Sequence, residues 1–198
     1  MVRIKFCGLT RLQDIEMVNA LHPDYIGFVF YEKSKRFIEA KAAEILKSNL
    51  RPDIQSVGVF VNEKAETVAK LLNTGIIDIA QLHGQEDEKY IEHLRKLASK
   101  KIIQAFKIKS KEDIIKAEKS SADHILLDSG AGTGKAFNWE LLKDIKRPYF
   151  LAGGLYPENV KEALEKLDPF AVDVSSGIET DGYKDREKME KFLKECGR

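Results

Sequence analysis

Short runs of β-branched and aromatic residues recur along the whole chain at fairly even intervals. Such runs, bounded by polar or turn-forming residues, predict β-strands. The eight predicted strands are Val2–Phe6, Tyr25–Phe30, Ser56–Val61, Ile77–Leu82, Ile102–Phe106, His124–Leu127, Tyr149–Ala152 and Phe170–Val174.

Apolar residues in the intervening segments recur every three or four positions, which predicts helices with one face packed on a sheet. These stripes are Ile15, Val18 and Leu21; Ala65, Val68, Leu71 and Leu72; Ile91, Leu94 and Leu97; and Met189, Phe192 and Leu193. The shortest helical candidate follows the sixth strand, at Trp139–Ile145. Strands that alternate with helices predict an α/β protein with a parallel sheet.

The length of the chain decides between an open sheet and a closed barrel. Its 198 residues leave about 25 for each of eight units, and a strand, a helix and two loops of average length need about 24. An open doubly wound sheet usually has about five or six strands, so eight strands favour closure. We therefore predict one domain, a (βα)₈ TIM barrel that spans residues 1–198.

Charge and composition exclude several classes of partner. The 33 basic and 32 acidic residues give a net charge of +1, which leaves no basic field for a nucleic acid or an anionic membrane. Neither a membrane span nor a signal peptide is evident in the sequence. The two cysteines, Cys7 and Cys196, are too few for a disulfide framework. These features predict a cytoplasmic protein.

The first predicted strand carries candidate chemistry, because the active site of a barrel lies at the C-terminal ends of its strands. Successive strand residues face opposite sides, so Ile4 and Phe6 face the helices while Lys5 and Cys7 point into the barrel. A nearby ammonium favours a thiolate, which makes Lys5 the candidate to activate Cys7. The alternative is that Cys7 is a small buried hydrophobe.

Three other strand ends carry polar candidates. Asp128 follows three apolar residues, and a carboxyl that loses solvent holds its proton more tightly, as a general acid requires. It could instead cap the following loop. Gln81 and His83 share one face at the end of the fourth strand and are predicted to point into the same pocket. Arg36, after the second strand, could bind a substrate carboxylate through two parallel bonds, although lone arginines are usually solvated.

Glycine-bearing turns follow the last two strands. They contain Gly153 and Gly154 after the seventh strand, and Ser175, Ser176 and Gly177 after the eighth. Loops at these positions form the recurrent phosphate site of barrels, because glycine lets backbone N–H groups approach the anion. Gly153-Gly154 alone also fits a simple turn, but the paired turns favour a phosphorylated small molecule.

The run Gly130-Ala131-Gly132-Thr133-Gly134-Lys135 invites comparison with a nucleotide-binding loop. Its two outer glycines are one residue too close for that motif, and alanine follows the lysine where Ser or Thr is required. We interpret the run as a flexible lid after the sixth strand. The spacing of His22, His93 and His124 shows no metal-ligand pattern, so we predict no structural or catalytic metal.

Five segments together resemble the phosphoribosylanthranilate isomerase family. They are Lys5-Phe6-Cys7-Gly8-Leu9-Thr10, Gln81-Leu82-His83-Gly84, Leu127-Asp128 with the glycine loop, Leu151-Ala152-Gly153-Gly154-Leu155 and Asp173-Val174-Ser175-Ser176-Gly177-Ile178-Glu179. They occur in the family's order and at its strand ends, across essentially the whole chain. Phe6 and Asn138 depart from the residues that are commoner in the family, a β-branched residue and Asp.

The resemblance implies an isomerase of tryptophan biosynthesis that converts N-(5-phosphoribosyl)anthranilate into 1-(2-carboxyphenylamino)-1-deoxyribulose 5-phosphate, an Amadori rearrangement, without metal or cofactor. It implies that Asp128 is the general acid that opens the ribose ring and that Cys7 is the general base that takes the proton from C2. It also implies that Arg36 holds the anthranilate carboxylate, that Asp173 contacts a ribose hydroxyl and that the glycine turns hold the phosphate. A monomer and a homodimer both fit the sequence.

Two alternatives remain at this point. The related barrel isomerase of histidine biosynthesis performs the same rearrangement on a twice-phosphorylated substrate, but that family carries an aspartate at the position of Cys7. A non-catalytic barrel that only binds sugar phosphates would keep the glycine turns without needing both Cys7 and Asp128.

Overall fold

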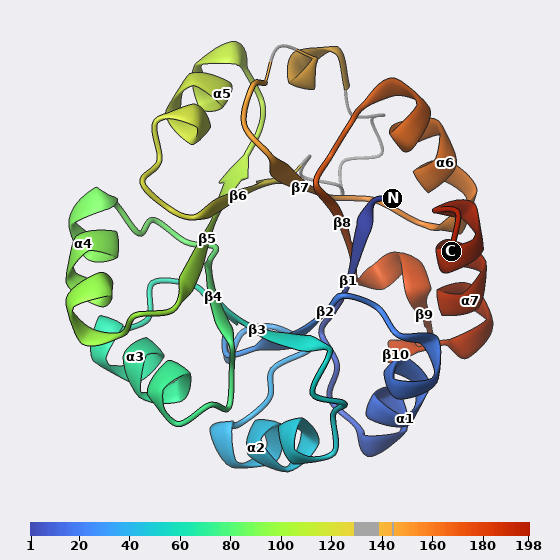
Figure 1. The fold of residues 1–198 in the computed structure, drawn as a ribbon, viewed down its shortest axis with the longest axis horizontal. Helices are drawn as coiled ribbons and strands as arrows, with labels where there is room; N and C mark the ends of the chain where they lie inside the picture. Colours follow the sequence, from blue (N-terminus) through green and yellow to red (C-terminus); the bar gives the residue numbers. More distant parts are fainter. Residues whose placement is uncertain (129–138, 144) are drawn as a thin grey trace.

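Parallel pairing joins every predicted strand to its neighbours along the chain in this computed structural model, which describes residues 1–128, 139–143 and 145–198. The last strand pairs with the first, so the sheet closes into a barrel (Figure 1). Its strands are β1 (Arg3–Cys7), β2 (Tyr25–Val29), β3 (Gln55–Phe60), β4 (Ile79–Leu82), β5 (Lys101–Lys107), β6 (His124–Asp128), β7 (Tyr149–Ala152) and β8 (Ala171–Val174). The predicted (βα)₈ fold is confirmed.

Helices surround the barrel and cover its outer face (Figure 1). They are α1 (Leu12–Leu21), α2 (Ala40–Ser48), α3 (Ala65–Asn73), α4 (Glu88–Leu97), α5 (Lys111–Glu118), α6 (Pro157–Lys166) and α7 (Arg186–Glu195). The four predicted apolar stripes lie on α1, α3, α4 and α7. Among the described residues, no helix has both the length and the apolar character that a membrane crossing requires.

Local sequence explains where individual helices begin and end, and α4 is an example. The Asp87 carboxylate accepts a hydrogen bond of 2.9 Å from the backbone N–H of Tyr90, which satisfies one of the unpaired donors in the first turn. Arg95 and Lys96 lie in the last turn, where positive charge meets the negative end of the helix dipole. Ile91 and Leu94 are fully buried against the sheet.

Two sequence predictions need correction. The segment after β6 forms a short 3₁₀ helix, η1 (Trp139–Leu142), instead of an α-helix, and the N–H groups of Lys143 and Ile145 just after it bond to carbonyls three residues back. The fourth strand begins at Ile79 rather than at Ile77, because the Ile77 N–H bonds to the carbonyl of Leu71 at the end of α3.

The interior of the barrel is separate from the core beneath the helices. Its apolar cluster comprises Tyr25, Val57, Ile79, Ile103, Leu126, Phe150, Ala152 and Ala171. Polar side chains follow these residues toward the C-terminal strand ends, and Lys5, Gln81 and Asp173 are all buried. The barrel floor is therefore apolar, while the chemistry lies at one rim.

A short extension follows β8 before the last helix. It comprises a 3₁₀ helix, η2 (Ser176–Ile178), and an antiparallel hairpin of β9 (Glu179–Thr180) and β10 (Tyr183–Lys184). This hairpin lies between α1 and α7, next to the end of β1 (Figure 1). The proposed lid at 130–135 and Asn138 lie outside the described residues.

Candidate active site

Cys7 is the last residue of β1, and its side chain is buried in the barrel. Its partner on β2 is Gly27, and a Cβ atom there would lie 2.6 Å from the sulfur. Glycine therefore leaves the space that the thiol occupies. The Cys7 carbonyl accepts a hydrogen bond of 2.9 Å from the hydroxyl of Ser175, which ties β1 to the loop after β8.

A buried ion pair lies one layer deeper in the barrel. Lys5 and Asp173 are partners in the register of β1 and β8, and the Lys5 ammonium lies 2.8 Å from Asp173 Oδ2. Lys5 thus points into the barrel, as strand alternation predicts. Asp173 Oδ1 is buried and has no hydrogen-bond partner among the described residues. It is an acceptor that a ligand hydroxyl or a water could satisfy.

Burial raises the pKa of the Cys7 thiol above its ordinary value. The charges of Lys5 and Lys184 and a hydrogen bond from Lys5 lower it, but burial outweighs them and the charge of Asp173 adds to the increase. Lys5 therefore favours the thiolate, in the direction that the sequence predicts, but burial of the sulfur has the larger effect and the net shift of the Cys7 pKa is upward. For Lys5, burial lowers the pKa, yet Asp173 reverses the shift and raises it, so this side chain stays an ammonium.

Asp128 ends β6, on the face of the strand that carries the interior residue Leu126. Because all eight strands are parallel, Asp128 and Cys7 lie at the same rim of the barrel and on inward-facing positions. The Asp128 side chain is about one-fifth exposed, and its Oδ2 lies 3.3 Å from His83 Nε2. Asp128 is thus accessible to a ligand at that rim.

Gln81 and His83 lie together at the end of β4, with the Gln81 amide nitrogen 3.1 Å from His83 Nδ1. When this amide donates to Nδ1, the ring proton resides on Nε2 and faces Asp128. Gln81 is almost fully buried, and its amide oxygen has no partner among the described residues. The sequence thus predicted that the two side chains share one position at the rim. It did not predict that Gln81 contacts His83 and that His83 in turn contacts Asp128.

The loops after β7 and β8 approach each other closely. Gly153 and Gly154 have φ angles of 92° and 65°, which favour glycine. A Cβ atom at Gly177 would lie 2.0 Å from the carbonyl oxygen of Leu155, so this close approach also requires glycine. A hollow of about 320 Å³ between the loops is lined by Gly154, Ser176 and Gly177 among others, whereas Gly153 and Ser175 do not line it.

The Arg36 side chain lies over Gly8, just after the end of β1. A Cβ atom built on Gly8 would lie only 2.4 Å from the Arg36 side chain. Its guanidinium makes two hydrogen bonds of 2.7 Å to the two carboxylate oxygens of Glu179. These bonds occupy two of its five N–H donors. Hydrogen bonding to Glu179 raises the pKa of Arg36 despite its partial burial, so the side chain remains cationic.

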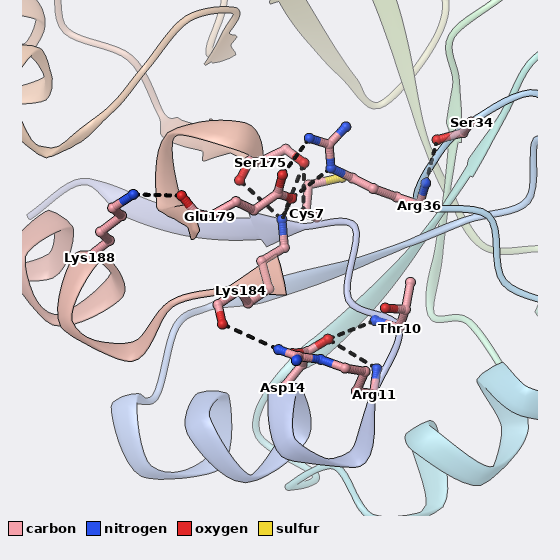
Figure 2. A network of polar contacts seen from close by, with 10 residues as sticks. All are labelled: Cys7, Thr10, Arg11, Asp14, Ser34, Arg36, Ser175, Glu179, Lys184 and Lys188. Atoms are coloured by element: carbon pink, nitrogen blue, oxygen red, sulfur yellow. Dashed lines mark hydrogen bonds and ion pairs between the residues drawn. The ribbon is translucent and has the colours of Figure 1, made fainter. Parts of the chain in front are cut away.

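Glu179 and Lys184 are site residues that sequence reasoning missed (Figure 2). Glu179 is the last residue of the Ser-Ser-Gly-Ile-Glu segment, so its place in the motif was the available signal. Lys184 gave no signal, because only the turn of the β9–β10 hairpin brings it back to Glu179. Among the described residues, no three His, Cys, Asp or Glu side chains are grouped so as to hold a metal ion.

The fold, with a thiol, a carboxyl and glycine loops at the C-terminal ends of its strands, defines a (βα)₈-barrel enzyme. Comparison with known proteins narrows this class. The family described as N-(5'-phosphoribosyl)anthranilate (PRA) isomerase matches residues 4–195, and the chain belongs to that family.

Individual relatives agree with this assignment. The chain is 46% identical over 200 residues to the N-(5'-phosphoribosyl)anthranilate isomerase of Thermoanaerobacter sp. (strain X514), which covers 98% of this chain and 97% of the relative. It is similar to PRA isomerase in complex with reduced 1-(o-carboxyphenylamino)-1-deoxyribulose 5-phosphate, with 36% identity, a TM-score of 0.89, and 100% and 99% coverage of the two chains. It is also similar to monomers generated from the dimeric enzyme of Thermotoga maritima, with 35% identity, a TM-score of 0.86 and the same coverage.

Proposed function

We propose that this chain isomerises N-(5'-phosphoribosyl)anthranilate to 1-(2-carboxyphenylamino)-1-deoxyribulose 5-phosphate in tryptophan biosynthesis by general acid–base catalysis. The observation that carries the proposal is the inward-facing pair Cys7 and Asp128 at one rim of the barrel of a PRA isomerase. The reaction moves hydrogens within one molecule. An acid and a base therefore supply everything that its atom balance requires.

Asp128 acts as the general acid in this proposal. It gives its proton to the ring oxygen of the ribose while the anilino nitrogen donates electrons to C1, so the C1–O bond breaks and a Schiff base forms. The Nε2–H of His83 then bonds to the carboxylate that remains, 3.3 Å away at Oδ2. General acid catalysis of this kind contributes about 10²- to 10⁴-fold in rate.

Cys7 acts as the general base. Its thiolate removes the C2 proton of the Schiff base, and the electrons of the broken C–H bond move toward the nitrogen to give an enolamine. Tautomerisation of the enolamine yields the ketone. The ammonium of Lys5 stabilises the thiolate and partly offsets the increase in the Cys7 pKa that burial causes. This charged partner of the base lies one layer of side chains deeper in the barrel.

The remaining groups bind the substrate. The turns that contain Gly153, Gly154, Ser175, Ser176 and Gly177 hold the phosphate, whose binding orients the sugar over the two catalytic groups. The unpartnered Asp173 Oδ1 accepts a ribose hydroxyl. Arg36 binds the anthranilate carboxylate with guanidinium donors that Glu179 leaves available. Gln81 and His83, predicted from sequence as substrate ligands, lie next to Asp128, and His83 is placed to donate to the general acid as well.

The proposal extends to the molecule as a whole. Residues 1–198 form one isomerase domain that works in the cytoplasm without a cofactor and binds no nucleic acid, as its net charge of +1 favours. The chain is a monomer or a homodimer, and its similarity to a protein derived from a dimeric enzyme makes the homodimer the form to test first. Light scattering of the purified protein distinguishes the two.

The experiment follows the loss of PRA fluorescence with purified protein and with the variants Cys7→Ala and Asp128→Ala. Each variant is expected to lose at least about 100-fold in kcat. Cys196→Ala provides a matched control, because Cys196 is the other buried cysteine and lies at the end of α7. Absence of turnover in the unaltered protein would refute the activity, and full activity of either variant would remove that residue from the mechanism.

A further inference from the structure

Glu179 joins two parts of the rim that are far apart in the sequence (Figure 2). Its side chain is 8% exposed and accepts hydrogen bonds from Arg36, in the loop after β2, and from Lys184, at the end of the hairpin. The distances are 2.7 Å to each of two Arg36 nitrogens and 2.5 Å to the Lys184 ammonium. One carboxylate thus holds two cations.

Lys184 continues the connection toward the catalytic sulfur. Its side chain is 1% exposed, and its ammonium donates to the Ser175 carbonyl at 3.0 Å as well as to Glu179. The hydroxyl of Ser175 in turn donates to the carbonyl of Cys7 at 2.9 Å. A continuous series of hydrogen bonds therefore runs from Arg36 to the backbone of the residue that we assign as the base.

The charges in this network leave a net positive charge at the rim. Burial would raise the pKa of Glu179, but hydrogen bonds from Arg36 and Lys184 outweigh burial and lower it, so the carboxylate is ionised. Burial lowers the pKa of Lys184, and its hydrogen bond to Glu179 opposes that shift. While Lys184 is protonated, one anion between two cations leaves one unit of positive charge. Two parallel hydrogen bonds from the Arg36 guanidinium to Glu179 also fix the plane of the guanidinium, which a single hydrogen bond would not do.

We propose that Glu179 is a positioning residue that holds the Arg36 guanidinium in the one orientation that recognises a carboxylate ortho to the substrate nitrogen. Lys184 fixes this carboxylate by a second hydrogen bond, and its bond to the Ser175 carbonyl connects the network to the loop after β8. The enzyme thereby selects an anthranilate over a plain aniline in the substrate. This inference depends on the proposed function, because it takes the PRA carboxylate as the ligand of Arg36.

A purely structural role is the competing explanation. Glu179 and Lys184 also attach the hairpin to the barrel, and loss of that attachment would disturb phosphate and carboxylate binding alike. The two roles therefore differ in selectivity. Positioning of Arg36 affects only ligands that carry the ring carboxylate, whereas a loosened hairpin weakens every phosphorylated ligand.

The test measures binding of two ligands by calorimetry: reduced 1-(o-carboxyphenylamino)-1-deoxyribulose 5-phosphate and the same compound without the ring carboxylate. For Glu179→Gln, the preference for the carboxylated ligand is expected to fall about 10- to 100-fold, the range that charged hydrogen bonds of about 1.5–3 kcal/mol represent. Affinity for the second ligand should change less than about threefold. Arg36→Lys should lose the same preference, because lysine cannot make the paired contact.

Three controls keep the test decisive. Glu190→Gln makes the same chemical change on the exposed face of α7 and should leave both affinities unchanged. Glu179→Gln in an Arg36→Lys background should reduce the preference no further. If Glu179→Gln fails to fold because Lys184 lies buried beside it, the double variant Glu179→Gln/Lys184→Met removes that cation and should lose the same preference.

Two results would overturn the inference: an unchanged preference in Glu179→Gln, or an equal loss of affinity for both ligands. Either result would leave the proposed function intact, provided that the unaltered enzyme converts PRA. Failure of the unaltered enzyme to convert PRA would instead refute the function on which the inference rests.

Discussion

The sulfur of Cys7 occupies the place that a side chain on Gly27 would take, since a Cβ atom there would lie 2.6 Å from Sγ. Gly27→Ala is therefore expected to displace the thiol while leaving the backbone conformation of β2 accessible. A displacement of about 1 Å at a catalytic group lowers the rate by about 100-fold. Steady-state kinetics should show the loss mainly in kcat.

Gly58→Ala on β3 is the matched control for this substitution. Its Cβ atom would also be crowded, but by side chains of Ile77 and Phe60 rather than by the thiol. Both variants should lower the unfolding temperature through overpacking, and only Gly27→Ala should reduce kcat strongly. Equal effects of the two variants on kcat would contradict a specific role for the space at Gly27.

The pH dependence of turnover should reflect the buried thiol. Burial raises the pKa of Cys7, so the thiolate is the minor form near neutral pH and increases about tenfold for each pH unit below the pKa. If this thiolate is the base, kcat/KM rises with pH until the thiol has ionised. The pH dependence of iodoacetamide alkylation of Cys7, in protein with Cys196→Ala, should give the same apparent pKa as the kinetics.

The ion pair of Lys5 and Asp173 predicts a strong and conditional effect on stability. Lys5→Met would leave the Asp173 carboxylate buried without its cation, which destabilises a protein by about 3–5 kcal/mol. In the double variant Lys5→Met/Asp173→Leu both charges are gone, and most of that stability should return. Urea denaturation of the unaltered protein, of the single variants Lys5→Met and Asp173→Leu and of the double variant measures the coupling, and additive losses would show that the two side chains act independently.

His83 should affect the reaction through Asp128. His83→Leu removes the N–H that faces Asp128 Oδ2 at 3.3 Å, and kcat is expected to fall about tenfold or more because the carboxylate loses a donor. His83→Gln keeps an amide donor in that region and should recover part of the loss. A pure increase in KM for both variants would indicate direct substrate binding by His83, as first predicted from its position.

Periodicity gave the alternating strands and helices, and the length of the chain, at about 25 residues for each of eight units, was enough to predict the closed barrel. Strand alternation also placed Lys5 and Cys7 inside it, because a parallel strand in a barrel has one face toward the helices and one toward the interior. The start of β4 was misplaced because Ile77 is apolar and buried in either conformation. Hydrophobic pattern does not distinguish a strand residue from one that bonds back to a helix, as Ile77 does to Leu71.

The pKa shifts and ion pairs of the site could not be predicted without the three-dimensional structure. Lys5 next to Cys7 indicated an activated thiol, but burial of the sulfur has the larger effect on its pKa. The balance between solvent loss and nearby charge depends on side chains from β8 and the hairpin, which sequence does not place. For the same reason, Arg36 gave no sign of its pairing with Glu179, 143 residues further along the chain.

The opposite end of the barrel holds an ionisable group whose surroundings favour the neutral form. His124, the first residue of β6, stacks on Phe170 at 5.0 Å and meets Phe150 edge-on at 5.8 Å. Burial lowers the pKa of His124 below its ordinary value of 6.5, and the charge of Lys101 lowers it further. The folded protein therefore takes up this proton at a lower pH than the unfolded chain does.

This difference in proton uptake predicts a loss of stability in mild acid. Above about pH 6.5 His124 is neutral in both states, whereas below it the unfolded chain binds the proton first, so the free energy of unfolding falls until the folded state is protonated too. His124→Gln should flatten that part of the curve measured by urea denaturation between about pH 8 and pH 5. His93→Gln makes the same replacement at a histidine whose side chain is 51% exposed and is the comparison variant for the curve. An equal slope in the unaltered protein and His124→Gln would show that other groups cause the acid sensitivity.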